Sequence, residues 1–135
     1  MTPSRPARLY TLDEARALVP RLRALLTALR VERRQLVAET EALRKIAPAM
    51  RGNGHAVEAS RHEERVTELT AAIRGKLGQI AAMGIEVKDL ETGLVDFPTL
   101  RDGRIVYLCW RADEPTVAYW HELDAGLAGR QHLDE

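Results

Sequence analysis

The sequence predicts an α+β protein in which a long antiparallel helical hairpin, preceded by a short helix, packs on a small antiparallel β-meander of about four strands. Leucines recur at helical spacing through residues 11–83, whereas apolar and polar residues alternate in short runs through 84–122. Five of the six aromatic residues also lie in the second stretch. With 135 residues the chain has the length of a single domain (1–135), and we expect residues 123–135 to form an irregular tail.

The first helix is expected to begin at a capping box. Thr11 stands three residues before Glu14, so its hydroxyl and the Glu14 carboxylate can each bond an amide of the first helical turn. Pro20 follows soon after. A proline inside a helix costs about 3 kcal/mol but is tolerated in a first turn, so we expect a short helix ending at Leu18 and a second one beginning at Pro20. A single kinked helix is the alternative.

An apolar seam indicates a helical hairpin. Four leucines recur every seven residues, at Leu22, Leu29, Leu36 and Leu43. Residues 48–54 have the composition of a turn, and helical spacing resumes over residues 66–83 with Gly84 as the expected C-terminal cap. Two helices cannot cover each other's seams completely, so the remaining stripe must meet the second half of the chain or a second copy. We expect a homo-oligomer, most simply a dimer.

The second half is expected to form four strands, over residues 85–88, 94–97, 105–110 and 116–121. In the simplest register Trp110 pairs with Thr116 across a five-residue loop, so Ile105 faces His121. Cys109 and His121 would then lie about 13 Å apart along the sheet. This register predicts that the two side chains cannot share one metal ion.

The charge balance excludes several classes of protein. The chain has no net charge, with 30% charged and 45% hydrophobic residues, unlike a disordered tail or a polybasic arm. Residues 1–83 nevertheless carry a net charge of +6 and residues 84–135 one of −6. Nucleic-acid binding through the basic half is therefore a hypothesis, but we do not favour it, because glutamates interleave with the arginines and no aromatic side chain stands among them.

We expect a soluble cytoplasmic protein that does not enter the membrane. Cys109 is the only cysteine, so no disulfide can form within the chain. The longest uncharged stretch in the central chain is far shorter than the roughly 18 to 20 residues that a membrane span requires.

Chemistry-bearing residues gather between Asp96 and Glu122. Asp96, Cys109, Glu114, His121 and Glu122 lie there among large aromatics, a mixture that can ligate a transition metal or perform acid–base work. We consider His121, Asp96, Glu122 and Asp124 as ligands of a divalent metal ion. The alternative is structural: Cys109 is a small buried hydrophobe, and His121 is hydrogen-bonded at the end of a strand.

These residues also carry a resemblance. The segments Gly93–Pro98, Val106–Arg111 and Trp120–Gly126, together with Tyr10–Ala15 and Met83–Asp89, resemble the bacterial domain-of-unknown-function family 2203. The family has no established activity, so the resemblance implies no reaction. Its pattern implies a functional cluster of polar and aromatic positions: Asp96, Cys109, Trp110, Glu114, His121, Glu122 and Arg130.

Three functions follow, in order of preference. The first is an oligomeric interaction module without enzymatic activity that binds a protein partner through the hairpin and an uncovered sheet face. The second is a metal-binding protein or metal-dependent enzyme with its site at Asp96, His121 and Glu122. The third is nucleic-acid binding through the basic helical half.

Overall fold

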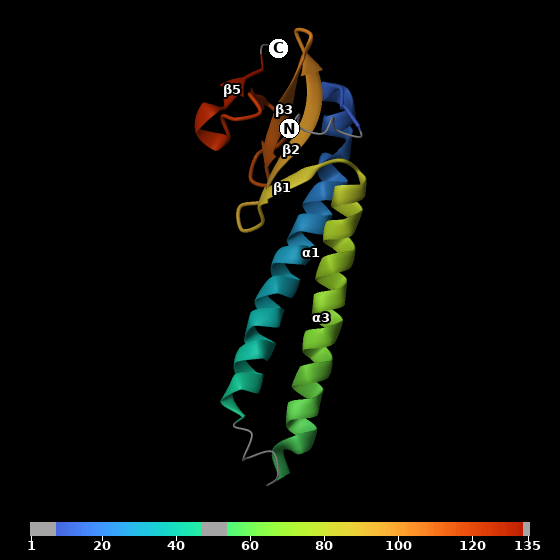
Figure 1. Cartoon of the computed structure of the whole chain (residues 1–135), viewed down its shortest axis with the longest axis vertical. Coiled ribbons are helices and arrows are strands. Elements are labelled where there is room, and N and C mark those ends of the chain that lie inside the picture. Colours follow the sequence, from blue (N-terminus) through green and yellow to red (C-terminus); the bar gives the residue numbers. More distant parts are fainter. Residues whose placement is uncertain (1–7, 47–53, 134–135) are drawn as a thin grey trace, which may run out of the picture. The chain divides into compact units, whose positions relative to one another are not determined.

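The computed structural model describes residues 8–46 and 54–133, which form two packed antiparallel helices followed by an antiparallel five-strand meander (Figure 1). The chain divides into two compact units. The sheet unit comprises Met1–Leu26 and Gly78–Glu135, and the hairpin unit comprises Thr27–Leu77. The predicted fold class is confirmed, whereas the predicted turn at residues 48–54 lies, except for Gly54, outside the described residues.

Helix α1 runs from Leu12 to Lys45 and begins at the predicted capping box. The Thr11 N–H donates to Glu14 Oε1 at 2.8 Å, and the Glu14 N–H donates to Thr11 Oγ1 at 3.1 Å. The predicted break at Pro20 is wrong, because Pro20 lies inside this one helix. Val19 and Leu22, on either side of the proline, are both buried, and this burial offsets the cost of the missing hydrogen bond.

Helix α3 runs from Ala56 to Ala82 and ends at the predicted glycine cap. Gly84 has φ +77° and donates its N–H to the Ala81 carbonyl, while the Ile85 N–H donates to the Ile80 carbonyl. This is the hydrogen-bond pattern of a Schellman motif, in which a left-handed residue satisfies the last carbonyls of a helix. Ile85 is buried against the last turn and leads directly into the first strand.

Within the hairpin unit the predicted seam is only partly covered. Leu29 of α1 and Leu69 of α3 are buried, whereas Leu36 and Leu43 are half-buried. Two polar contacts between described residues of this unit join the helices. Lys76 Nζ lies 2.9 Å from Glu32 Oε2, and His62 Nδ1 lies 2.5 Å from Glu39 Oε2.

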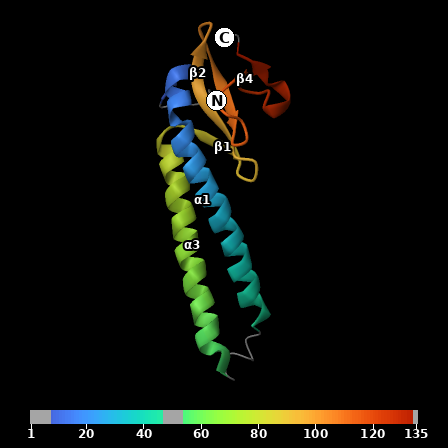
Figure 2. The ribbon, with the colours of Figure 1, turned by 180° about the vertical axis from the view of Figure 1, so that it is seen from behind.

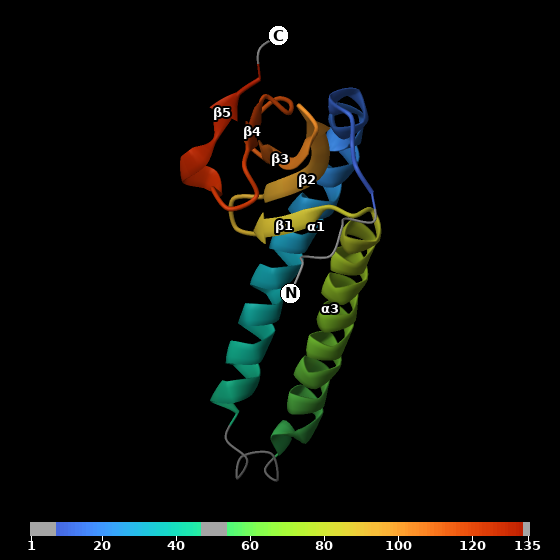
Figure 3. The ribbon, with the colours of Figure 1, turned by 45° about the horizontal axis from the view of Figure 1, so that its top comes forward.

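The sheet has the order β1-β2-β3-β4-β5, with every neighbouring pair antiparallel. Its strands are β1 (Glu86–Asp89), β2 (Leu94–Arg101), β3 (Arg104–Arg111), β4 (Tyr119–His121) and β5 (Gln131–His132). Figure 3 shows β1, β2 and β3 side by side, with β5 near the C-terminus. Between β2 and β3, Asp102 and Gly103 both adopt positive φ (50° and 78°), as a two-residue hairpin turn requires.

One face of the sheet forms the core of the sheet unit. Val95, Phe97, Val106 and Trp110 are all fully buried there. The start of α1 lies against this sheet (Figure 2), where the Tyr10 ring meets Phe97 edge-on at 5.4 Å and the Tyr10 N–H donates to the Pro98 carbonyl at 2.7 Å.

Two predictions about the sheet are wrong. The tail was expected to be irregular, but Leu127–Gly129 form a 3₁₀ turn (η2) and β5 adds a fifth strand on β4. The register of β3 with β4 also differs from the expected one by two residues, because His121 pairs with Tyr107 instead of Ile105. The connection is longer than predicted, since Glu114 Oε1 accepts the Arg111 N–H and Trp110 Nε1 donates to the Glu114 carbonyl.

Among residues 8–46 and 54–133, no helix combines the length and the apolar character that a membrane span requires.

Candidate functional site

Three neighbouring strands bring a carboxylate, a thiol and an imidazole together on the sheet face opposite the core. Asp96 of β2 pairs directly with Cys109 of β3, and His121 of β4 pairs with Tyr107, two residues before Cys109. Side chains two apart in a strand point the same way, so all three lie on one face. Their exposed fractions are only 1%, 0% and 2%. We call Asp96, Cys109 and His121 the buried triad.

The hydrogen bonds of His121 define which ring nitrogen carries a proton. Nδ1 lies 2.7 Å from the backbone oxygen of Glu122, and a carbonyl oxygen only accepts, so Nδ1 is the donor. Nε2 lies 3.0 Å from both carboxylate oxygens of Asp96. In the neutral ring Nε2 has a lone pair, which would face the lone pairs of a carboxylate. A cation must therefore lie between them, either a proton or a metal ion.

The thiol of Cys109 is not set up as a nucleophile. Burial raises its pKa to about 12, and the negative charge of Asp96 adds to this increase, while the Arg130 guanidinium opposes it. The reactive thiolate would therefore be scarce at neutral pH. Both nitrogens of His121 are also engaged elsewhere, so the imidazole is not oriented toward the thiol as a base, and the side chain that bonds the thiol is the Asp96 carboxylate. The geometry is not that of a Cys–His–Asp catalytic triad.

The buried triad instead has the composition and size of a metal site. One carboxylate oxygen, one sulfur and one ring nitrogen all lie within 4.8 Å of one another. Ligand bonds to zinc are about 2.0 to 2.3 Å, so ligand atoms around a tetrahedral ion lie about 3.3 to 3.8 Å apart. Small side-chain adjustments would close the difference. The Nδ1–H bond to a backbone carbonyl is also the usual way in which proteins orient a metal-binding histidine.

Aromatic and charged side chains surround the triad. The Tyr107 ring lies 5.5 Å from the His121 ring. Burial raises the pKa of Tyr107 to about 12, and its hydrogen bond to Glu86 and the charges of Glu86 and Asp96 act in the same direction. Both Tyr107 and Cys109 are therefore protonated at neutral pH, which keeps additional negative charge out of the site.

Arg130 connects the C-terminal segment to the triad. Its guanidinium lies 4.0 Å from the centre of the Tyr119 ring, and Nη2 donates to the Cys109 carbonyl at 3.2 Å and to Glu114 Oε1 at 2.6 Å. Glu114 and Arg130, both in the predicted functional cluster, thus hold the loop and the C-terminal segment beside β3.

The remaining predicted residues lie outside the triad. Trp110 is a core residue on the opposite face, with the Arg23 guanidinium 5.1 Å from its ring centre. The Glu122 side chain pairs with Arg104, and only its backbone oxygen reaches His121. Asp124 lies in an exposed turn. Of the four expected metal ligands, the structure brings together His121 and Asp96 but not Glu122 or Asp124.

Cys109 is the residue whose distance from His121 was predicted wrongly. The expected register separated it from His121 by about 13 Å, but the observed register places it one diagonal step away. The missed signal is the length of the loop after Arg111. The side-chain bonds of Trp110 and Glu114 that lengthen this loop cannot be read from alternation alone.

The protein is of the α+β class: two packed antiparallel helices are followed by a five-strand antiparallel meander, and three strands of the meander carry the buried triad. A family model described as "Uncharacterized conserved protein (DUF2203)" matches residues 8–133. The chain therefore belongs to the DUF2203 family, as the resemblance implied. No curated protein matches it, and no solved structure does.

Proposed function

We propose that this protein binds one transition-metal ion, with Zn²⁺ as the best match, through Asp96, Cys109 and His121. The observation that carries the proposal is the contact between His121 Nε2 and both oxygens of Asp96 at 3.0 Å, with the Nδ1 proton already committed to a carbonyl. A bound cation resolves the conflict between these two acceptors. A buried thiol within reach favours zinc over magnesium or calcium, which select oxygen ligands.

Three protein ligands leave one tetrahedral position for water or a small molecule, as in catalytic zinc sites. The ligands come from three consecutive strands, so the ion would cross-link β2, β3 and β4 and would stabilise the sheet by the free energy of binding. Because each ligand is at most 2% exposed, we assign the ion a stabilising role and no reaction.

Metal replacement in the purified chain tests the proposal. After exhaustive chelation, one equivalent of Co²⁺ should bind and give the near-ultraviolet absorption of a cobalt–thiolate bond, and one equivalent of Zn²⁺ should abolish it. Because Cys109 is the only cysteine, that absorption would identify one ligand without any variant. An ion pair between imidazolium and Asp96 would instead leave the protein without stoichiometric metal, and this result would reject the proposal.

Matched variants separate ligation from folding. His121→Ala should lose the bound ion, whereas His132→Ala, which removes a histidine from the neighbouring strand β5, should keep it. Asp96→Asn preserves the side-chain shape and should weaken binding while circular dichroism still reports a folded sheet. Equal metal content in His121→Ala and His132→Ala would count against the assignment.

We also infer self-association through the hairpin unit, as its seam predicts. Leu36 and Leu43 are seven residues apart, which places them on one face of α1, and both remain half-buried. A second copy of the same hairpin would cover these side chains in a self-complementary interface. Sedimentation equilibrium of the purified chain should therefore report a dimer, and Leu43→Glu should shift it toward monomer. A strict monomer at every concentration would contradict this inference.

A further inference from the structure

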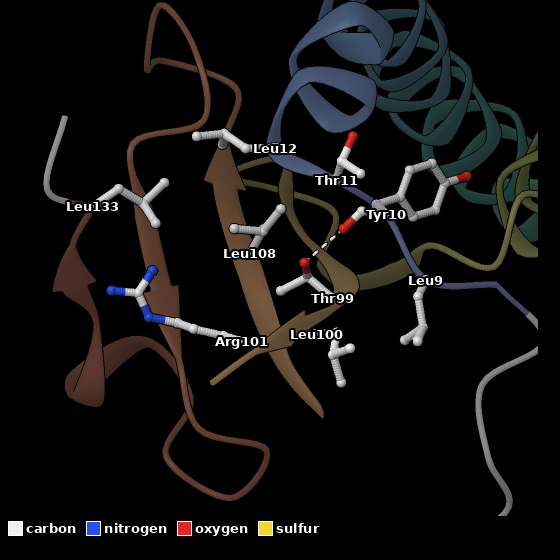
Figure 4. A pocket seen from close by; sticks show the side chains of 9 residues that line it. All are labelled: Leu9, Tyr10, Thr11, Leu12, Thr99, Leu100, Arg101, Leu108 and Leu133. Atoms are coloured by element: carbon white, nitrogen blue, oxygen red, sulfur yellow. Dashed lines mark hydrogen bonds between the residues drawn. The ribbon is translucent and has the colours of Figure 1, made fainter. Parts of the chain in front are cut away.

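A hollow lies within the sheet unit, away from the buried triad (Figure 4). It has a volume of about 500 Å³ and is bordered by the segment before α1, the end of β2 and the residue after β5. Thr99 and Leu108, which line it, project from the sheet face opposite to Asp96 and Cys109, since side chains alternate along each strand. Pockets that bind small molecules have volumes of about 300 to 1,000 Å³.

The lining is apolar except at one edge. Five leucines contribute to it: Leu9, Leu12, Leu100, Leu108 and Leu133. Two hydroxyls near the pocket are already committed, because Thr99 Oγ1 donates to the Tyr10 carbonyl at 2.6 Å and Tyr10 Oη donates to the Met83 carbonyl at 2.5 Å. The third hydroxyl, Thr11 Oγ1, accepts the Glu14 N–H at 3.1 Å, so the side chains that a ligand would meet here are mainly the leucines.

Arg101 is the charged side chain that lines the pocket. Its guanidinium lies 4.6 Å from the centre of the Trp120 ring, and no carboxylate within residues 8–46 and 54–133 pairs with it. The neighbouring Arg104 differs, because it forms an ion pair with Glu122. Arg101 thus offers hydrogen-bond donors to an anion beside the leucines.

We propose that this pocket binds an amphiphilic carboxylate, with an alkyl chain among the leucines and the carboxylate on Arg101. One planar guanidinium pairs with a carboxylate through two parallel hydrogen bonds. Among the described residues of the lining Arg101 is the single cation, which matches a monoanion better than a phosphate dianion. The apolar chain supplies affinity in proportion to its buried length, about fourfold per methylene.

Titration calorimetry with decanoate, and with decanol as the uncharged probe, tests both halves of the proposal. Decanoate should bind with one-to-one stoichiometry and more tightly than octanoate and hexanoate. Arg101→Gln should lower the affinity for decanoate at least tenfold and leave that for decanol unchanged. Arg104→Gln is the matched control: it removes an arginine that also lies beside Trp120 but does not line the pocket, so both affinities should remain.

A second variant keeps the test independent of Arg101. Leu100 is 59% exposed, so Leu100→Glu leaves the core intact while placing a negative charge at the pocket. It should repel decanoate and lower its affinity at least tenfold. Absence of decanoate binding below its micellar concentration, or binding that neither Arg101→Gln nor Leu100→Glu weakens, would overturn the proposal.

Discussion

The raised pKa of the Cys109 thiol makes metal affinity depend on pH in a calculable way. The thiol has a pKa of about 12 in the metal-free protein, so at neutral pH it carries a proton that a binding metal ion must displace. At pH 7 this displacement costs about 7 kcal/mol, from five pH units at 1.36 kcal/mol each. The cost falls as pH rises, because free protons become scarcer.

The apparent affinity for Zn²⁺ should therefore rise at least tenfold per pH unit, or about 30-fold between pH 6.5 and 8.0. A chromophoric zinc chelator of known affinity, competing with the protein at each pH, measures this slope. Cys109→Ala should reduce the slope by one proton per ion and weaken binding at every pH. His132→Ala should keep both the slope and the affinity.

Two results would refute this reasoning. An affinity that is flat between pH 6.5 and 8.0 would mean that no thiol proton is displaced. A slope that is the same in Cys109→Ala and in the parent chain would mean that the displaced proton comes from another group. Either result would remove Cys109 from the ligand set.

Three further outcomes concern stability. The Cys109 pKa is raised from 9.0 to about 12, so in the metal-free chain the protonated thiol contributes up to about 4 kcal/mol to the free energy of unfolding. This contribution is complete below pH 9 and is lost as pH rises toward 12. Denaturant titrations in alkali should show a smaller loss of stability in Cys109→Ala. Gly93→Ala should lower the free energy of unfolding by more than about 2 kcal/mol, because φ is +69° and the added Cβ would lie 2.6 Å from Ala112 Cβ. An unchanged midpoint in the denaturant titration would contradict this strain. Leu29→Ala should cost about 2 to 5 kcal/mol, and half-buried Leu36→Ala clearly less; equal costs would contradict the observed burial.

Local signals in the sequence were sufficient for the start of α1, the end of α3 and the positions of most strands. The Thr11–Glu14 capping box and the Gly84 cap each depend on residues within one or two helical turns, so the rest of the chain has little effect on whether these caps form. The predicted strands 94–97 and 105–110 lie within β2 and β3, although both observed strands are longer and meet at the two-residue turn of Asp102 and Gly103.

Long-range contacts decided what local signals left open. Whether Pro20 ends a helix depends on the burial of Val19 and Leu22 in the folded chain, which no local propensity contains. The short strand β5 likewise has too few residues for a periodic pattern and exists because Gln131 and His132 pair with β4.

Only part of the candidate site could be predicted from the sequence. His121 and Asp96 could be named from their residue types, but their partner could not, because a shift of two residues along β4 decides whether Cys109 or a more distant side chain lies beside the imidazole. That shift is determined by the loop after Arg111 and by its bonds to Glu114, which only the tertiary structure reveals. Sequence by itself therefore determined which chemical groups are available, and the packing of the strands decided which of them meet, since register depends on contacts between residues far apart in the chain.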